Sequence, residues 1–158
     1  MPQVAWGFDM IKIAIKTNSE NYQDGRFEEI AHILNEASEL VFNGFGSETE
    51  ILLSSNGNEV GALLMNAPML TFEPKALSEV RKYDHMMLSL ETRGDAFIGE
   101  GKYSECSRII KEAAGKVRGC YMDFELRDIN EEVVGKVENC LAVKPAPTKK
   151  KITKSMGI

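Results

Sequence analysis

The stretch "LLSSNGNEVGALL", Leu52–Leu64, has the pattern of a β-hairpin, because two apolar runs flank a polar turn. Its Asn56-Gly57 pair favours a tight turn, since both residues tolerate a positive φ. A related stretch, "LRDINEEVVGKVE", occurs at Leu126–Glu138, where Asn130 is kept but the glycine of the turn is lost. We therefore expect the second hairpin to use a different turn type.

Each hairpin also carries a glycine at the same place after its turn, Gly61 in the first stretch and Gly135 in the second. A glycine inside a strand weakens it, and it often occurs where the strand bulges or another backbone comes close. The pair predicts a bulge or a close backbone contact in both hairpins.

A strand with alternating apolar residues precedes each hairpin by one helix. In "MIKIAIKTN", Met10–Asn18, the three isoleucines share one face, and in "MMLSLETR", Met86–Arg93, one face holds Met86, Leu88 and Leu90. A period of two is typical of a strand with one buried face. Both segments are therefore predicted to be strands, with Thr17 of the first matching Thr92 of the second.

A helix is predicted between each strand and its hairpin, because apolar residues recur at steps of three and four. The stripe of the first helix is Phe27, Ile30, Ala31, Leu34, Ala37 and Val41, and that of the second is Tyr103, Cys106, Ser107, Ile110, Ala113 and Val117. The expected end signals are Asp24 as an N-cap, and Asn43-Gly44 and Gly119 as left-handed C-terminal residues. Gly115 should weaken the second helix by up to about 1 kcal/mol relative to alanine.

These elements predict an α+β fold built from two tandem β-α-β-β repeats. One such unit is too small to be stable alone, so the two should form a pseudo-twofold antiparallel sheet assembly with helices packed on one side. The expected segments are an N-terminal extension (1–9), the first repeat (10–65), a connector (66–85), the second repeat (86–143) and a basic disordered tail (144–158). The connector is expected to hold a short strand "MLTF" and a short helix "KALSEVRKY". Whether the repeats share one sheet or form two lobes stays open.

Charge is distributed unevenly along the 158 residues. The formal net charge is −5, and because the tail holds five lysines and no acid, the preceding part carries −10. An acidic body disfavours a broad phosphate-binding surface and favours solubility or a partner with a basic surface. No apolar run approaches the ~20 residues of a membrane span, and no secretory signal is recognisable at the start. Three cysteines without C-x-x-C spacing indicate free thiols in a reducing cytosol.

Motifs of known chemistry are incomplete. The stretch "GDAFIGEGKYS", Gly94–Ser104, resembles a phosphate-binding loop, but it has Ala96 in place of the first glycine and Tyr103 in place of Ser or Thr. His85 precedes a strand, and no Ser-His-Asp order is evident. The sequence therefore predicts no catalytic residues, no cofactor and no metal site, although a site assembled by the fold at the seam of the repeats stays open.

Two surfaces are candidates for binding a partner. The first is the outer face of the first helix, with Glu28, Glu29, His32, Glu36 and Glu39. The second is the basic tail, with Lys149, Lys150, Lys151 and Lys154. The first could contact a protein and the second could contact phosphates without sequence preference, but solvated charges alone would account for both.

The strand, the "FEEIAHIL" helix and the "NGNEVG" hairpin resemble a family of small, mostly uncharacterised phage and prophage proteins. The resemblance covers Met10–Leu64 well and extends to the second copy through Thr92, Tyr103, Ile109, Ile110, Asn130, Val134 and Gly135. Because family members usually have one unit, this chain would be a duplicated form. The resemblance supplies no catalytic residues; it implies a small cytoplasmic protein, made in a bacterial host, that acts on host machinery.

The function predicted from these observations is that of a non-enzymatic interaction protein. It would bind a host or phage protein and inhibit or redirect it, as an anti-defence or host-takeover factor, with homo-oligomer formation left open. The alternative is a protein that binds single-stranded DNA or RNA through its sheet and its basic tail. No membrane partner is expected.

Overall fold

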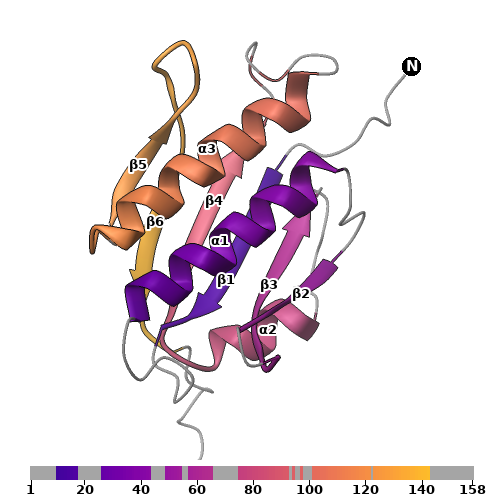
Figure 1. Ribbon diagram of the computed structural model, residues 1–158, viewed down its shortest axis with the longest axis vertical. Helices are drawn as coiled ribbons and strands as arrows, with labels where there is room; N and C mark the ends of the chain where they lie inside the picture. The colour runs from indigo at the N-terminus through magenta and orange to yellow at the C-terminus, as the bar shows by residue number, and fades with distance from the viewer. Residues whose placement is uncertain are drawn as a thin grey trace, which may run out of the picture.

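The computed structural model describes residues 10–17, 26–43, 49–54, 57–65, 75–92, 94, 97, 101–121 and 123–142. These residues form six strands and three helices (Figure 1). Their order is β1 (Met10–Lys16), α1 (Arg26–Phe42), β2 (Thr49–Leu53), β3 (Glu59–Met65), α2 (Lys75–Arg81), β4 (His85–Glu91), α3 (Gly101–Arg118), β5 (Phe124–Arg127) and β6 (Val133–Cys140). The predicted α+β class is confirmed, as is the predicted short helix of the connector.

All six strands form one antiparallel sheet in the order β2-β3-β1-β4-β6-β5. The two central strands pair over their whole length, from Met10 opposite Glu91 to Lys16 opposite His85. The question whether the strands share one sheet or form two lobes is therefore answered in favour of one sheet. β2 and β5 are its two edges (Figure 1).

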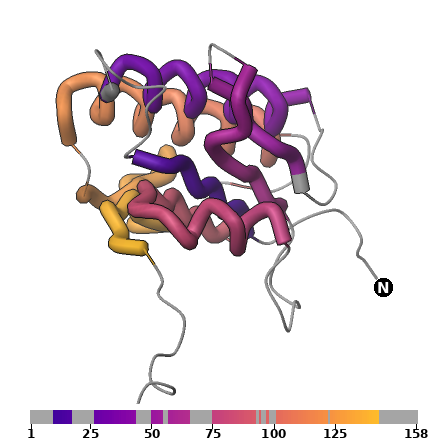
Figure 2. Tube along the Cα trace, turned by 90° about the horizontal axis from the view of Figure 1, so that it is seen from below, coloured from indigo at the N-terminus to yellow at the C-terminus, as the bar shows by residue number. Residues whose placement is uncertain are grey.

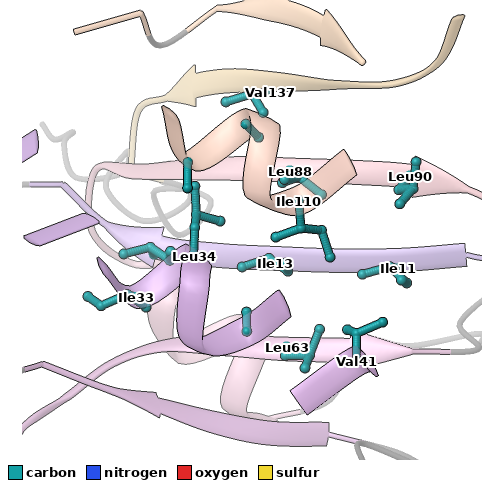
Figure 3. Packing of buried hydrophobic residues seen from close by; sticks show 14 of the residues in the cluster. Ile11, Ile13, Ile33, Leu34, Val41, Leu63, Leu88, Leu90, Ile110 and Val137 are labelled. Carbon is teal, nitrogen blue, oxygen red and sulfur yellow. The ribbon is translucent and has the colours of Figure 1, made fainter. Parts of the chain in front are cut away.

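The main core lies between the sheet and the pair α1 and α3, which run side by side in opposite directions (Figure 1). Alternation places Ile11, Ile13 and Ile15 of β1 on this face, all fully buried. Figure 3 shows Ile11 and Ile13 of β1 and two leucines of β4, Leu88 and Leu90, beneath Leu34 of α1 and Ile110 of α3. The predicted stripes of both helices are confirmed, because their residues are buried or half-buried. Burial removes their apolar surface from water, which favours folding.

α2 covers part of the opposite face of the sheet (Figure 2). Leu77 and Val80 of α2 pack on a second cluster formed by Ala14, Ala62, Leu64 and Met87. The expectation that the two long helices pack on one side is confirmed for α1 and α3, whereas α2, the helix of the expected connector, lies on the other side. The reason is that small and apolar residues of the central strands leave a second apolar patch that also needs cover.

The first hairpin turn is held by Ser54. Its N–H donates to the Asn58 carbonyl at 2.8 Å, and its carbonyl accepts the Gly57 N–H at 2.9 Å. Its side-chain oxygen accepts the Asn58 N–H at 3.3 Å. Gly57 has the expected positive φ, 85°, and Asn56 lies outside the described residues.

The second hairpin turn has the same hydrogen bonds around Asp128. Its N–H donates to the Glu132 carbonyl at 3.0 Å, and its carbonyl accepts the Glu131 N–H at 2.9 Å. Its carboxylate accepts the Glu132 N–H at 3.0 Å, and Glu131 has a φ of 66°. The two turns thus share these hydrogen bonds, and Glu131 adopts the left-handed conformation that a glycine adopts more easily. Residues 55 and 56, on which the type of the first turn depends, lie outside the described residues, so the expectation of a different turn type stays a prediction.

The predicted close backbone contacts of the two glycines are confirmed. A Cβ at Gly61 would lie 2.7 Å from the Ala14 carbonyl oxygen of β1, and one at Gly135 would collide with the Ser89 carbonyl of β4. The pairing register also shifts in both hairpins, after Leu52 and after Leu126. Each hairpin is thus pressed against a central strand at a position where only a hydrogen atom fits.

The helix ends differ from expectation. Gly119 continues the helical hydrogen bonding of α3, and the left-handed residue is Cys120, with a φ of 75°. The Cys120 N–H donates to the Val117 carbonyl at 2.8 Å, and the Tyr121 N–H donates to the Lys116 carbonyl at 3.0 Å. This pair of bonds is a Schellman motif, which requires its positive φ one residue beyond Gly119.

At the end of α1, the Asn43 N–H donates to the Glu39 carbonyl at 3.0 Å, so Asn43 also continues the helical pattern. The other expected end signals, Asp24 and Gly44, lie outside the described residues, as do the expected "MLTF" strand, the N-terminal extension and the tail.

Candidate functional site

The β2 edge, Thr49–Leu53, exposes apolar side chains at the margin of the sheet. Ile51 is 43% exposed and Leu53 is 47% exposed, whereas Leu52 between them is buried in the core. Within the described part of the chain, β2 pairs with β3 alone, so its outer side has no strand neighbour. An unpaired edge with apolar side chains is a template on which another strand can add.

The β5 edge has the same backbone pairing as the β2 edge but different side chains. Glu125 and Arg127 flank the buried Leu126 as Ile51 and Leu53 flank Leu52, and the register shift falls at the same place. The Arg127 Nη2 lies 3.0 Å from the Glu125 Oε1, and both side chains are exposed. Charged side chains protect an edge from pairing, because a docking strand would have to desolvate them. The β2 edge therefore favours a further strand and the β5 edge disfavours one.

A groove of about 660 Å³ lies beside the β2 edge, between the edge and α2. Ile51, Gly61, Ala76 and Val80 line it with apolar or small groups. We call it the α2 groove. Because it is continuous with the β2 edge, a strand added there could place a side chain in it.

The rim of the α2 groove carries charges of both signs, from Lys16, Lys75, Glu59 and Glu79. The Lys16 ammonium lies 4.0 Å from the centroid of the Tyr83 ring, a cation–π contact that holds both side chains at the rim. Tyr83 is still 48% exposed. The rim therefore offers an exposed aromatic surface and no strong excess of one charge.

The residues proposed from the sequence for partner binding lie on the outer side of α1. Glu28, His32, Glu36 and Glu39 are exposed, and Glu29 is half-buried. The His32 Nε2 lies 3.4 Å from the Glu36 Oε2. Two ion pairs reach across to α3, Glu39–Lys111 at 3.0 Å and Glu28–Arg118 at 3.9 Å. Part of this acidic surface is thus neutralised within the molecule, and its role in binding stays a prediction.

The nucleic-acid alternative has two parts. The tail lysines Lys149, Lys150, Lys151 and Lys154 lie outside the described residues. In the six strands the one aromatic residue is Phe124, which packs against the main core. The sheet therefore lacks the exposed rings on which bases stack.

A buried carboxylate, Glu105, ties the second hairpin to α3. It is 9% exposed and accepts hydrogen bonds from the Arg108 Nη2 at 2.8 Å and from the Ile129 N–H at 2.8 Å. The hydrogen bond from Arg108 lowers the pKa of Glu105; burial opposes this effect and the Ile129 bond adds to it. Arg108 also contacts Glu112 at 2.8 Å. The network holds the turn in place, and its one arginine is already shared by two carboxylates.

We expect Glu105→Gln to lower the free energy of unfolding by roughly 1–2 kcal/mol at pH 7, because the charged hydrogen bonds are lost. The folded-state pKa of Glu105 lies below its ordinary value of 4.5. Its contribution is therefore complete above pH 4.5 and is lost as the pH falls through the lowered value. Urea unfolding at pH 7 and pH 3 should show a difference between wild type and variant that shrinks in acid.

The matched control is Glu112→Gln, since Glu112 pairs with the same arginine but is 63% exposed. It should change stability by less than about 0.5 kcal/mol. Equal losses for the two variants, or a loss for Glu105→Gln that does not depend on pH, would contradict the role assigned to the buried carboxylate.

Other chemical groups do not assemble into a site. A groove of about 320 Å³ between α3 and β5 is lined by arginines that are already paired with glutamates. Burial raises the pKa of the Cys106 thiol to about 12, and burial also raises that of Cys140. Within the described residues, no three His, Cys, Asp or Glu side chains gather as metal ligands, and no helix is long and apolar enough to cross a membrane.

No protein-family model, curated protein or solved structure matches this chain. The resemblance to phage proteins therefore stays a prediction.

Sequence reasoning did not single out the β2 edge. The alternating pattern predicted a hairpin but not which of its strands would lie at the margin of the sheet. A signal was nevertheless present: aligning the two hairpins places Ile51 against Glu125 and Leu53 against Arg127.

Proposed function

We propose that this chain is a protein-binding module that docks a polypeptide strand on the β2 edge. The observation that carries the proposal is the contrast between the two edges. Ile51 and Leu53 are exposed where Glu125 and Arg127 stand on the other side of the sheet. An apolar edge gains both backbone hydrogen bonds and apolar burial when a strand adds to it.

The proposal includes a duplicated scaffold, in which two β-α-β-β units related by a pseudo-twofold axis share the sheet. Supporting features are the strand order β2-β3-β1-β4-β6-β5, the matching hydrogen bonds of the two turns, and Gly61 and Gly135 against the two central strands. In such a scaffold the residues that the two halves share stabilise the fold, and the positions where the halves differ carry the function. The two edges differ in this way.

The predicted biological setting also belongs to this proposal. In it, the protein is phage-encoded, acts in the host cytoplasm and inhibits or redirects a host protein. The acidic surface of α1 would be a second contact in that setting. Its support is the motif resemblance and the acidic body of the chain.

A photoreactive amino acid placed at position 51 of the full chain tests the docking. Position 125, at the same place on the other edge, is the matched control. After irradiation in bacterial cells, we expect one saturable covalent adduct at position 51 and none at 125. Excess wild-type protein should suppress the adduct, and excess Ile51→Lys should not. Equal adducts at the two positions, or none, would remove the proposal.

A further inference from the structure

We propose that the polypeptide docked on the β2 edge is a second copy of this chain, which adds its own β2 in an antiparallel direction. The two-fold axis of the dimer would pass beside Ile51, and the pairing of the two β2 strands would join the two sheets into one. This inference rests on the proposed docking function, because it names the occupant of the same edge.

The order of residues in β2 suits such self-pairing. Antiparallel pairing centred on Ile51 sets Ile51 opposite its own copy, residue 49 opposite Leu53, and Glu50 opposite Leu52. No acid then stands directly opposite an acid, although like charges directly opposite each other destabilise a pair of strands. Ile51, now about half exposed, would be covered by the same residue of the partner, and Leu53, also about half exposed, would lie opposite residue 49 of the partner.

The charges beside the edge favour a copy over a strongly charged partner. The rim of the α2 groove holds two lysines and two glutamates, Lys16, Lys75, Glu59 and Glu79. A surface with both signs in equal number does not repel a copy of itself as a uniformly charged surface would. A uniformly acidic or basic segment would meet like charges at half of these positions.

The other edge accounts for an assembly that stops at two chains. Glu125 and Arg127 protect β5 from pairing. Because the described strands offer one edge that favours pairing, the contact uses the same surface on both copies and closes on itself. The sheet would then be continuous over two chains, with a charged edge at each end.

Sedimentation equilibrium over a wide range of protein concentration tests the dimer. We expect wild type to dimerise, Ile51→Lys to associate at least about tenfold more weakly because it places two ammonium groups at the axis, and Glu125→Lys to behave as wild type. A wild-type chain that stays monomeric, or equal association of wild type and Ile51→Lys, would overturn the inference.

A disulfide tests the geometry of the pairing and can trap a dimer that forms only weakly. In a Cys120→Ser, Cys140→Ser background, Ile51→Cys should form a linked dimer under mild oxidation, because residues opposite each other at the axis lie within disulfide reach. Glu125→Cys should not. A linked dimer at 125 equal to that at 51 would overturn the inference.

The two proposals fail separately. If the chain stays monomeric while the photoreactive residue at position 51 captures a different protein, self-pairing is wrong and the docking function stands. If neither self-pairing nor a position-specific adduct is found, both are wrong.

Discussion

Replacing Gly135 by alanine should lower the free energy of unfolding by at least about 3 kcal/mol, or prevent folding altogether. The new Cβ would collide with the Ser89 carbonyl oxygen and lie 3.0 Å from the Leu90 Cα. Both atoms belong to the backbone of β4, so no side chain can rotate away to make room. The variant must separate β6 from β4, next to the centre of the sheet, and lose ladder hydrogen bonds and core packing together.

The loss of stability in Gly135→Ala can be compared, by urea unfolding, with the effects of the same substitution at two other glycines. Gly61→Ala should be destabilising but milder, because its closest contact is 2.7 Å, with Ala14. Gly115→Ala, on the exposed side of α3 with nothing within 4 Å, should stabilise the protein by up to about 1 kcal/mol. A Gly135→Ala protein as stable as wild type would show that the two strands are not held at this distance.

The second large effect is expected from making both edges apolar. The double variant Glu125→Ile, Arg127→Leu copies the β2 edge onto β5 and removes the ion pair that protects it. A chain with two adhesive edges can pair at both ends of its sheet, so association no longer closes at two chains. Light scattering should show assemblies that grow with concentration.

The control for this variant is the same pair of changes combined with Ile51→Lys. Growth should then stop at small assemblies, because one of the two edges is blocked again. A double variant that keeps the wild-type size distribution would show that these side chains do not decide whether an edge pairs. Because Glu125 and Arg127 are exposed, the changes should leave the core intact, and far-UV circular dichroism checks this.

Much of the fold was predictable because local patterns report burial directly. The isoleucines of β1 alternate because one face of the strand meets the core, and the stripes of α1 and α3 repeat at the helical period for the same reason. Even the tight contacts of Gly61 and Gly135 could be anticipated, since a glycine inside a strand often occurs where another backbone comes close.

Other features could not be predicted from the sequence, because they depend on neighbours distant in sequence or on the exact backbone conformation. Asp128 makes through its side chain and backbone the same hydrogen bonds as Ser54, so these bonds form without the glycine. The left-handed residue after α3 is Cys120 because Gly119 still takes part in the last helical turn. α2 lies on the second face because the sheet offers an apolar patch there.

The sequence by itself determined the elements of this protein, because apolar periodicity, turn residues and strand glycines act within a few residues of one another. Only the tertiary structure decided which strands meet and which are left at the margin. "LLSSNGNEVGALL" predicts a hairpin, but β3 pairs with β1 inside the sheet while β2 is left outside. That difference arises from pairing between residues far apart in the chain, and it turns Ile51 and Leu53 from ordinary strand residues into an exposed apolar edge.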